Sequence, residues 1–272
     1  MLTETDYTTQ EYLERVRHIR DLFLSPADLA VTCLILLSFD KFDLLLQNPL
    51  LKYAAQGWGE HSRGLDDCPT VTKYAVELLR DIDKVKLVEH ILWPPKLLRV
   101  RVRGTSALHL CSFFGLRGIA ERLLQEGQKP DLLDSESDSP LHYASRDGHP
   151  QMVELLFRTG KVEINARDKC GHSPLFRAIK NGHEGVVKLL LDTGKVDVDP
   201  RDKEGYSSLF EAAWNGHEGI VKLLIETGKV DVDPRDKLLQ ARRRPRRNTK
   251  VTTKTWRNLT HEIDSWTLKE TW

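Results

Sequence analysis

The sequence predicts an all-α solenoid, an array of stacked helix pairs, preceded by a helical connector. The first observation is a repeat, because the segment that opens at Gly171 returns at Gly205, 34 residues later, with nearly the same letters. The register continues backwards through a unit that opens at Ser137 and, one residue shorter, through a unit at Gly104. A period of this size indicates repeats that stack on one another. The second observation is that each unit carries two short apolar segments with helical spacing.

The unit that opens at Gly171 shows why two helices are expected in each repeat. Ser173 precedes Pro174, which places an N-cap hydroxyl before a proline whose missing N–H costs nothing at the first helical position. This first helix ends near Gly182, and a second, more apolar helix ends at Gly194 in the C-cap role. An extended arm and a β-turn loop lead to the next unit. Neither helix can bury its apolar face alone, so the units must stack.

These units resemble ankyrin repeats. Residues 139–142 read Ser-Pro-Leu-His, close to the Thr-Pro-Leu-His start of that family. Gly-His separates the two helices in three units, at Gly148, Gly182 and Gly216. The chain departs from the family where Phe176 and Phe210 replace the first-helix His, and where Gly115 is followed by Leu. The resemblance implies a protein-interaction scaffold that is not an enzyme.

A second resemblance lies before the repeats. Residues 48–63 follow the pattern N-P-L-x-x-Y-A-A-x-x-W-G-x-H-x-R, with related segments upstream at 30–34 and 37–40. This region looks like the helical part that follows the nucleotide-binding NACHT domain in large fungal proteins ending in ankyrin repeats. The resemblance implies a fragment or relative of a STAND-type, receptor-like signalling NTPase, of which this chain has the connector and the sensor but not the NACHT domain.

Nucleotide hydrolysis is not expected, because a P-loop needs G-x-x-x-x-G-K-[ST]. The Gly-Lys pairs at Gly160, Gly194 and Gly228 are each followed by Val. They recur because they mark the ends of helices, and no other nucleotide-binding motif was found.

These patterns set the expected domain boundaries. Residues 68–103 form a helical hairpin that ends at Trp93-Pro94, where an array needs an atypical terminal unit to cover its first repeat. The full prediction is a helical connector over 1–67, the capping hairpin over 68–103, ankyrin repeats over 104–136, 137–170, 171–204 and 205–237, and a basic, disordered tail over 238–272.

Composition excludes several classes of protein. With 40% hydrophobic and 30% charged residues the chain is globular. No signal pattern opens the sequence, and the apolar run 29–37 is too short to span a membrane. Four cysteines, Cys33, Cys68, Cys111 and Cys170, lack the short spacing of a zinc site or redox pair. We therefore expect an intracellular, cytoplasmic or nuclear protein with no cofactor, no metal, no membrane partner and no small-molecule substrate.

Two sets of polar residues that recur with the repeats could be mistaken for metal-binding sites. His149, His183 and His217 recur at the repeat period, but units stack roughly 10 Å apart whereas zinc ligands lie about 2 Å from the metal. We predict that these histidines hydrogen-bond backbone between helices. A second set, Asp197, Asp199 and Asp202, lies on the arm and turn of a repeat, beside Lys195, Arg201 and Lys203, without the spacing of a calcium loop.

The repeats are better suited to binding a protein partner than to binding a metal. The apolar and turn residues are nearly the same in all four repeats, but three positions vary. Followed from the first repeat to the fourth, they are Leu110, Tyr143, Arg177 and Glu211, then Phe113, Arg146, Lys180 and Trp214, then Thr105, Asp138, His172 and Tyr206. Such sites line the concave side of ankyrin repeats, and we expect them to be exposed. Seven are predicted to bind a protein partner: Tyr143, Arg146, Arg177, Lys180, Tyr206, Glu211 and Trp214. Trp214 and Tyr206 are the predicted anchors, because aromatic residues supply many hot spots. The alternative is that these residues are ordinary solvent-exposed positions without a binding role.

The tail carries most of the positive charge. Residues 237–272 have a net charge of +7, whereas residues 1–236 have −6. Five arginines surround Pro245, at Arg242, Arg243, Arg244, Arg246 and Arg247. Three interpretations stay open for them: a solvated end, a nuclear-import sequence, or a phosphate-binding arm. The last two make a nuclear or nucleic-acid-associated adaptor one alternative function, and a hydrolase with an unrecognised site is the other.

Overall fold

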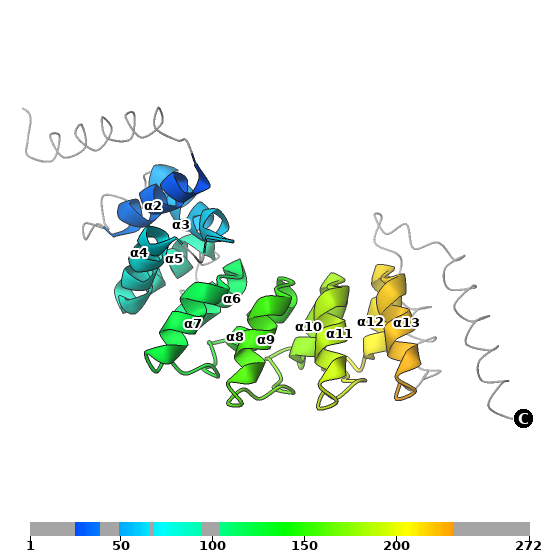
Figure 1. The fold of residues 1–272 in the computed structure, drawn as a ribbon. Helices are drawn as coiled ribbons and strands as arrows, with labels where there is room; N and C mark the ends of the chain where they lie inside the picture. Colours follow the sequence, from blue (N-terminus) through cyan, green and yellow to red (C-terminus); the bar gives the residue numbers. More distant parts are fainter. Residues whose placement is uncertain (1–24, 39–48, 66–67, 94–103, 231–272) are drawn as a thin grey trace, which may run out of the picture. The chain divides into compact units, whose positions relative to one another are not determined.

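The computed structural model describes residues 25–38, 49–65, 68–93 and 104–230 (Figure 1). Every regular element in these ranges is an α-helix, which confirms the all-α prediction. The chain divides into two compact units, residues 1–135 and 136–272. Helical spacing before residue 25 and the predicted tail over 238–272, with its five arginines, lie outside the described residues.

The first unit contains the connector, the hairpin and the first repeat. Its described helices are α2 (Pro26–Leu37), α3 (Pro49–Ser62), α4 (Pro69–Arg80), α5 (Ile82–Leu92), α6 (Ala107–Phe114) and α7 (Arg117–Gln125). Helix α2 packs against α3 and α4, and α4 packs against α5 and α7. The predicted hairpin is therefore formed by α4 and α5, and it contacts the second helix of the first repeat.

Two acidic side chains fix the ends of the hairpin. Asp81 lies between the helices and accepts the backbone N–H groups of Asp83 and Lys84 at 3.0 and 3.2 Å, so that it caps α5. Glu89, buried on α5, accepts the N–H groups of Gly104 and Thr105, each at 3.1 Å, and the Thr105 hydroxyl at 2.9 Å. The last turn of the hairpin thus holds the start of the first repeat.

The connector meets the first repeat through a few residues of the W-G-x-H-x-R segment. Trp58 on α3 is fully buried, and its ring packs edge-on against Phe114 of α6 with 5.2 Å between ring centroids. A Cβ on Gly59 would lie 2.1 Å from the same ring, so only glycine fits there. Arg63 Nε donates a hydrogen bond of 2.9 Å to the Phe114 carbonyl. The motif therefore joins connector and repeat.

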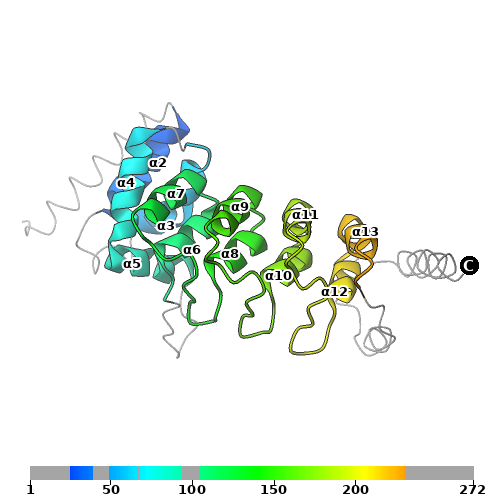
Figure 2. The same cartoon turned by 60° about the horizontal axis from the view of Figure 1, so that its bottom comes forward.

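The second unit contains three helix pairs. They are α8 (Pro140–Arg146) with α9 (Pro150–Arg158), α10 (Pro174–Asn181) with α11 (Glu184–Asp192), and α12 (Ser208–Asn215) with α13 (Glu218–Glu226). In Figures 1 and 2 the first helices α8, α10 and α12 form one row and the second helices α9, α11 and α13 form another. Buried leucine, valine and alanine side chains fill the space between the rows.

Serine caps start the first helices as the sequence predicts. The hydroxyls of Ser139, Ser173 and Ser207 accept the N–H three residues on, at 3.4, 3.2 and 3.1 Å. Gly182 and Gly216 end α10 and α12 in the left-handed conformation, with φ of 80° and 77°. The local signals of the sequence thus fix where each first helix begins and where two of them end.

The turns between repeats are linked to one another by backbone hydrogen bonds. The turn at 168–172 is closed by a hydrogen bond of 3.0 Å from Asp168 N–H to the His172 carbonyl, and the turn at 202–206 repeats this bond at 3.1 Å. Between the turns, Lys203 N–H donates to the Cys170 carbonyl at 3.1 Å. Successive repeats are therefore coupled along the turns as well as through their helices.

Candidate functional site

The candidate binding surface is the first-helix face, defined as helices α8, α10 and α12 together with the turns at 168–172 and 202–206. Helix α10 packs against both α8 and α12, so this face is continuous within the second unit (Figure 2). The turns at 168–172 and 202–206 connect α9 to α10 and α11 to α12. Side chains that vary between repeats are thus carried on a rigid, repeating frame.

Three of the predicted binding residues hold one equivalent, solvent-reaching position in the three repeats. The Lys180 side chain is 42% exposed and that of Arg146 is 21% exposed, while Trp214 is half-buried. The Arg146 guanidinium lies 4.4 Å from the Tyr143 ring centroid, and the Trp214 ring stacks on Phe210 at 5.9 Å. The Arg146 and Trp214 side chains thus pack on a ring of their own helix and stay partly exposed, and Lys180 is the most exposed of the three.

The expectation of exposure is wrong for most of the other variable positions. Tyr143 is fully buried, and Tyr206 and Glu211 are only 7% exposed. Buried as well are Leu110, Thr105, Asp138 and His172. The physical reason is that each turn packs on the first helix that follows it, and first helices of adjacent repeats pack on each other. Tyr206 stacks on Phe210 of its own repeat at 4.9 Å, and Glu211 reaches Lys180 of the preceding repeat. The exposed contact surface is narrower than the sequence implied.

Charge pairs tie the accessible residues to the frame. Lys180 Nζ lies 3.4 Å from Glu211 Oε1, a pair that crosses from α10 to α12. Arg146 donates from Nε and Nη2 to the two carboxylate oxygens of Asp147 at 3.1 and 2.8 Å. A partner that binds the cations of this face must compete with these carboxylates.

Arg177, a further predicted binding residue, serves mainly to join repeats. Its guanidinium pairs with Asp168, with a 2.8 Å hydrogen bond from Nε to Oδ2, and Nη2 lies 3.5 Å from Asp138 Oδ1. Burial alone would raise the pKa of Asp168, but contact with the His172 side chain and the charge of Arg177 hold it below the ordinary 3.8. Because two carboxylates of the preceding repeat hold its guanidinium, Arg177 has little freedom to contact a partner.

His142 caps α8 and is one of the most deeply buried polar groups. Its Nδ1 accepts the Ser139 N–H at 3.1 Å, and its Nε2 lies 3.2 Å from the His172 carbonyl of the next repeat. Burial lowers the pKa of His142 from 6.5 to about 4, because the imidazolium form would lose its hydration. Phe176 and Phe210 hold the same position in the following repeats.

Acidification from pH 7 to pH 4.5 is expected to lower the free energy of unfolding of the second unit by about 2–3 kcal/mol through His142. The unfolded chain takes up this proton below pH 6.5, whereas the folded chain resists it down to about pH 4, so the stabilisation is complete above pH 6.5 and lost on acidification. Urea unfolding at both pH values measures it. His142→Phe should flatten this part of the profile, and an unchanged slope in that variant would contradict the assignment. Asp168 contributes only at lower pH, since its stabilisation is lost as pH falls below 3.8.

Two of the three histidines of the Gly-His pairs, His183 and His217, have the structural role that was predicted. His183 Nε2 lies 2.8 Å from the Arg146 carbonyl, and His217 Nε2 lies 3.4 Å from the Lys180 carbonyl, so each histidine reaches the backbone of the preceding repeat. A Cβ on Gly148 would lie 2.4 Å from the His183 ring, and one on Gly182 would lie 2.6 Å from the His217 ring. Glycine of one repeat thus makes room for histidine of the next.

A comparison with protein families matches a model described as ankyrin repeats (3 copies) at residues 74–168 and 141–236, together more than half of the chain. The chain is an ankyrin-repeat protein. Ankyrin repeats indicate a protein–protein interaction module. The first match starts inside α4, so it includes much of the hairpin ahead of the first repeat.

Curated relatives share the repeats over short stretches. Rabankyrin-5 of Mus musculus is 31% identical over 68 residues, which is 25% of this chain and 6% of that protein. Ankyrin repeat and KH domain-containing protein mask-1 of Caenorhabditis elegans is 33% identical over 66 residues, 24% of this chain and 2% of the relative. Probable 26S proteasome regulatory subunit p28 of Saccharomyces cerevisiae is 31% identical over 77 residues, 28% of this chain and 34% of the relative. The matched part is therefore 34% or less of each relative.

The aspartates on the arm and turn of the third ankyrin repeat are used structurally, with partners other than those predicted. Asp197 pairs with Arg167 of the preceding repeat at 3.2 Å. Asp202 accepts the N–H groups of Glu204 and Tyr206, both at 2.9 Å. Only Asp199 approaches an expected partner, with its Oδ2 4.0 Å from Arg201 Nη2. These bonds shape the arm and the turn.

The thiols of the ankyrin protein are free, and the cysteine analysis overlooked one arrangement. Cys33 and Cys111 are buried, and burial raises the pKa of Cys33 to about 11, so it stays protonated. Cys170 is exposed, and its sulfur belongs with donor atoms of Asp168 and His172 to a group that lies within 4.8 Å. The signal was present as Asp-x-Cys-x-His, but it was missed because only spacings between cysteines were considered.

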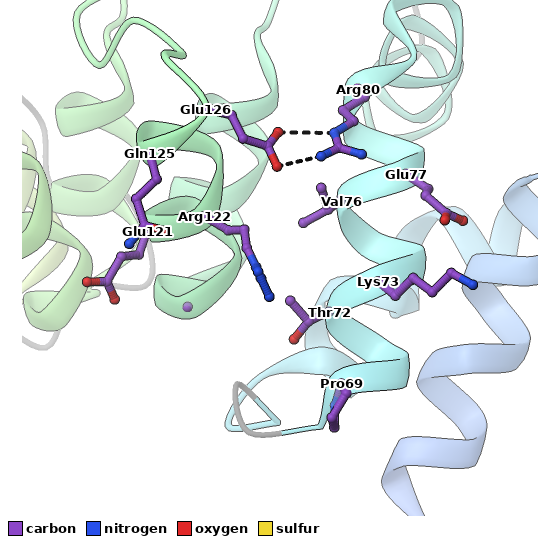
Figure 3. A pocket seen from close by; sticks show the side chains of 11 residues that line it. Pro69, Thr72, Lys73, Val76, Glu77, Arg80, Glu121, Arg122, Gln125 and Glu126 are labelled. Atoms are coloured by element: carbon purple, nitrogen blue, oxygen red, sulfur yellow. Dashed lines mark hydrogen bonds and ion pairs between the residues drawn. The ribbon is translucent and has the colours of Figure 1, made fainter.

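A groove runs between α4 and α7 in the first unit, with a volume of about 580 Å³. Figure 3 shows Arg80 of α4 reaching Glu126 of α7, with hydrogen bonds of 3.0 and 2.5 Å. The groove is lined by Lys73, Arg80 and Arg122 together with Glu77, Glu121 and Glu126. Because these charges are balanced, the groove selects no class of ligand. No helix in the described ranges is both long and apolar enough to cross a membrane.

Proposed function

We propose that this ankyrin-repeat chain is a non-enzymatic module that binds a protein partner through the first-helix face of its second unit. The observation that carries the proposal is the row formed by Arg146, Lys180 and Trp214, one accessible side chain per repeat at the same place. Arginine and tryptophan are enriched among the residues that dominate binding energy. Each stands on a frame that is already folded, so little entropy is lost on binding.

The buried members of the predicted site have a supporting role in this proposal. Tyr143 lies under Arg146, and the stacked rings of Tyr206 and Phe210 continue to Trp214. These contacts hold the accessible ends in fixed orientations, which favours recognition by shape. A partner with carboxylates and an apolar side chain suits two cations beside an indole.

We also propose that the chain is a relative of the fungal NACHT–ankyrin proteins that its connector resembles. Support comes from the packing of Trp58 and Gly59 on Phe114, which gives the resembling motif a physical task at the start of the repeats. In this proposal the connector transmits partner binding at the repeats to whatever precedes it. An intracellular location follows from the same proposal.

Affinity capture from cell extract tests the binding face. Trp214→Ala and Lys180→Ala are compared with Lys188→Ala and Lys222→Ala, which replace exposed lysines of the second helices α11 and α13. We expect a protein that the unmodified chain and both controls retain to be lost or weakened more than about tenfold in Trp214→Ala, since hot-spot truncations cost about 2 kcal/mol or more.

Thermal unfolding of all four variants separates loss of binding from loss of folding. The proposal fails if the second-helix variants lose the captured protein while the first-helix variants keep it, or if every variant retains the same set. Loss with a folded Trp214→Ala chain supports it.

A further inference from the structure

A compact group of metal-binding side chains lies in the turn between the second and third repeats. Asp168, Cys170 and His172 alternate along this turn, and one donor atom of each lies within 4.8 Å of the other two. The turn is rigid, because Asp168 Oδ1 accepts the N–H groups of Cys170 at 2.7 Å and of His172 at 2.9 Å. A carboxylate, a thiol and an imidazole are together a ligand set for zinc.

The His172 side chain points to a missing ligand. It is only 9% exposed, and its Nδ1 is buried without a hydrogen-bond partner among the described residues. Asp168 Oδ2 lies 3.4 Å from this nitrogen, yet the two atoms do not form a hydrogen bond. A buried imidazole nitrogen that lacks a partner costs free energy, and coordination of a cation would satisfy it.

The surroundings of His172 Nε2 also favour coordination of a cation by Nδ1. Nε2 lies 4.0 Å from Asp202 Oδ2 of the following turn, and the Asp202 side chain is 5% exposed. Histidines that bind a metal through one nitrogen commonly direct the other N–H to a carboxylate, which orients the ring and raises its basicity. Asp202 is placed to do this when Nδ1 is the ligand.

We propose that Asp168, Cys170 and His172 form a binding site for Zn²⁺ in the turn at 168–172. The ligands would be Asp168 Oδ2, Cys170 Sγ and His172 Nδ1, with the Cys170 thiol losing its proton on binding. Ligand atoms of one tetrahedral zinc lie about 3.5 Å apart, so the present separations need only a small adjustment of the exposed Cys170 side chain.

Arg177 sets the expected strength of this site. Its Nε and Nη2 both contact Asp168 Oδ2, while Asp168 Oδ1 already accepts two backbone N–H groups, so zinc must displace at least one guanidinium contact to reach Oδ2. The positive charge of Arg177 opposes that of the cation, so we expect a Kd on the order of 1–10 μM, weaker than closed four-ligand sites. This proposal departs from the sequence prediction that the chain binds no metal.

Titration of the full chain with Zn²⁺, followed by calorimetry, tests the proposal. We expect one Zn²⁺ per chain, more than about 100-fold weaker binding in Cys170→Ser, and about 10–100-fold weaker binding in Asp202→Asn. Cys170 is exposed, so its replacement leaves packing intact. Cys68→Ser, which changes a thiol outside the group, should bind like the unmodified chain.

Co²⁺ gives an independent reading, because a thiolate ligand produces a charge-transfer band that Cys170→Ser should remove and Cys68→Ser should keep. The proposal is overturned if the unmodified chain retains no Zn²⁺ at about 100 μM, or if Cys170→Ser binds as tightly as the unmodified chain. In that case His172 has only a structural place between Asp168 and Asp202. Neither result alters the proposed partner-binding face.

Discussion

Trp58→Ala is expected to lower the free energy of unfolding of the first unit by about 3–5 kcal/mol. The Trp58 ring is fully buried and packs against Phe114, which is itself 1% exposed, so its removal leaves a large cavity between connector and repeat. Neighbouring groups cannot fill this space, since Gly59 has no side chain and Arg63 is fixed to the Phe114 carbonyl. Urea unfolding followed by circular dichroism measures the change.

Tyr53→Ala is the matched control on the same helix. Tyr53 is 49% exposed and hydrogen-bonds to the His61 ring at the surface, so its loss should change stability by no more than about 0.5 kcal/mol. Similar effects of the two variants would show that α3 does not pack on α6 through Trp58.

Leu190→Ala should lower the free energy of unfolding of the second unit by about 2–5 kcal/mol. Leu190 is 1% exposed on α11, a helix that packs against α10 of its own repeat and against α9 and α13 of the neighbouring repeats. A cavity bounded on three sides cannot collapse, and the coupling of repeats spreads its effect to both neighbours. Denaturant melts of the variant should show a lower midpoint.

Lys188→Ala, two residues away on the same helix, controls for changes in helix propensity. Its side chain is exposed, so we expect a change within about 0.5 kcal/mol. If Leu190→Ala were equally mild, the inward face of the second helices would be assigned wrongly.

Much of the fold was predictable because its signals are local. Ser173 before Pro174, and glycine at 182, specify helix ends within a few residues of chain, and the structure has both. The contact of α3 with α6 was not predicted, because Trp58 and Phe114 are far apart in sequence and no local pattern pairs them.

The site was predicted less well for a related reason. Exposure of a first-helix residue depends on the repeat stacked against it, and helical periodicity within one repeat does not contain that information. Tyr143 and Glu211 therefore looked exposed and are buried, whereas Lys180 and Trp214 retain accessible ends. The closeness of Asp168 to Arg177 likewise follows from the turn, which the spacing of charges along the chain does not describe.

The Gly-His contacts bear on how such an array can change in length. Gly148 accommodates His183 and Gly182 accommodates His217, so each of these two contacts is shared by two successive repeats. If recombination removed the block 171–204, Gly148 would meet His217, and the hydrogen bond to the Arg146 carbonyl could form again with the new histidine. Duplication of the block would create the same contact once more. Gain or loss of a whole repeat therefore keeps the glycine–histidine contact at this junction.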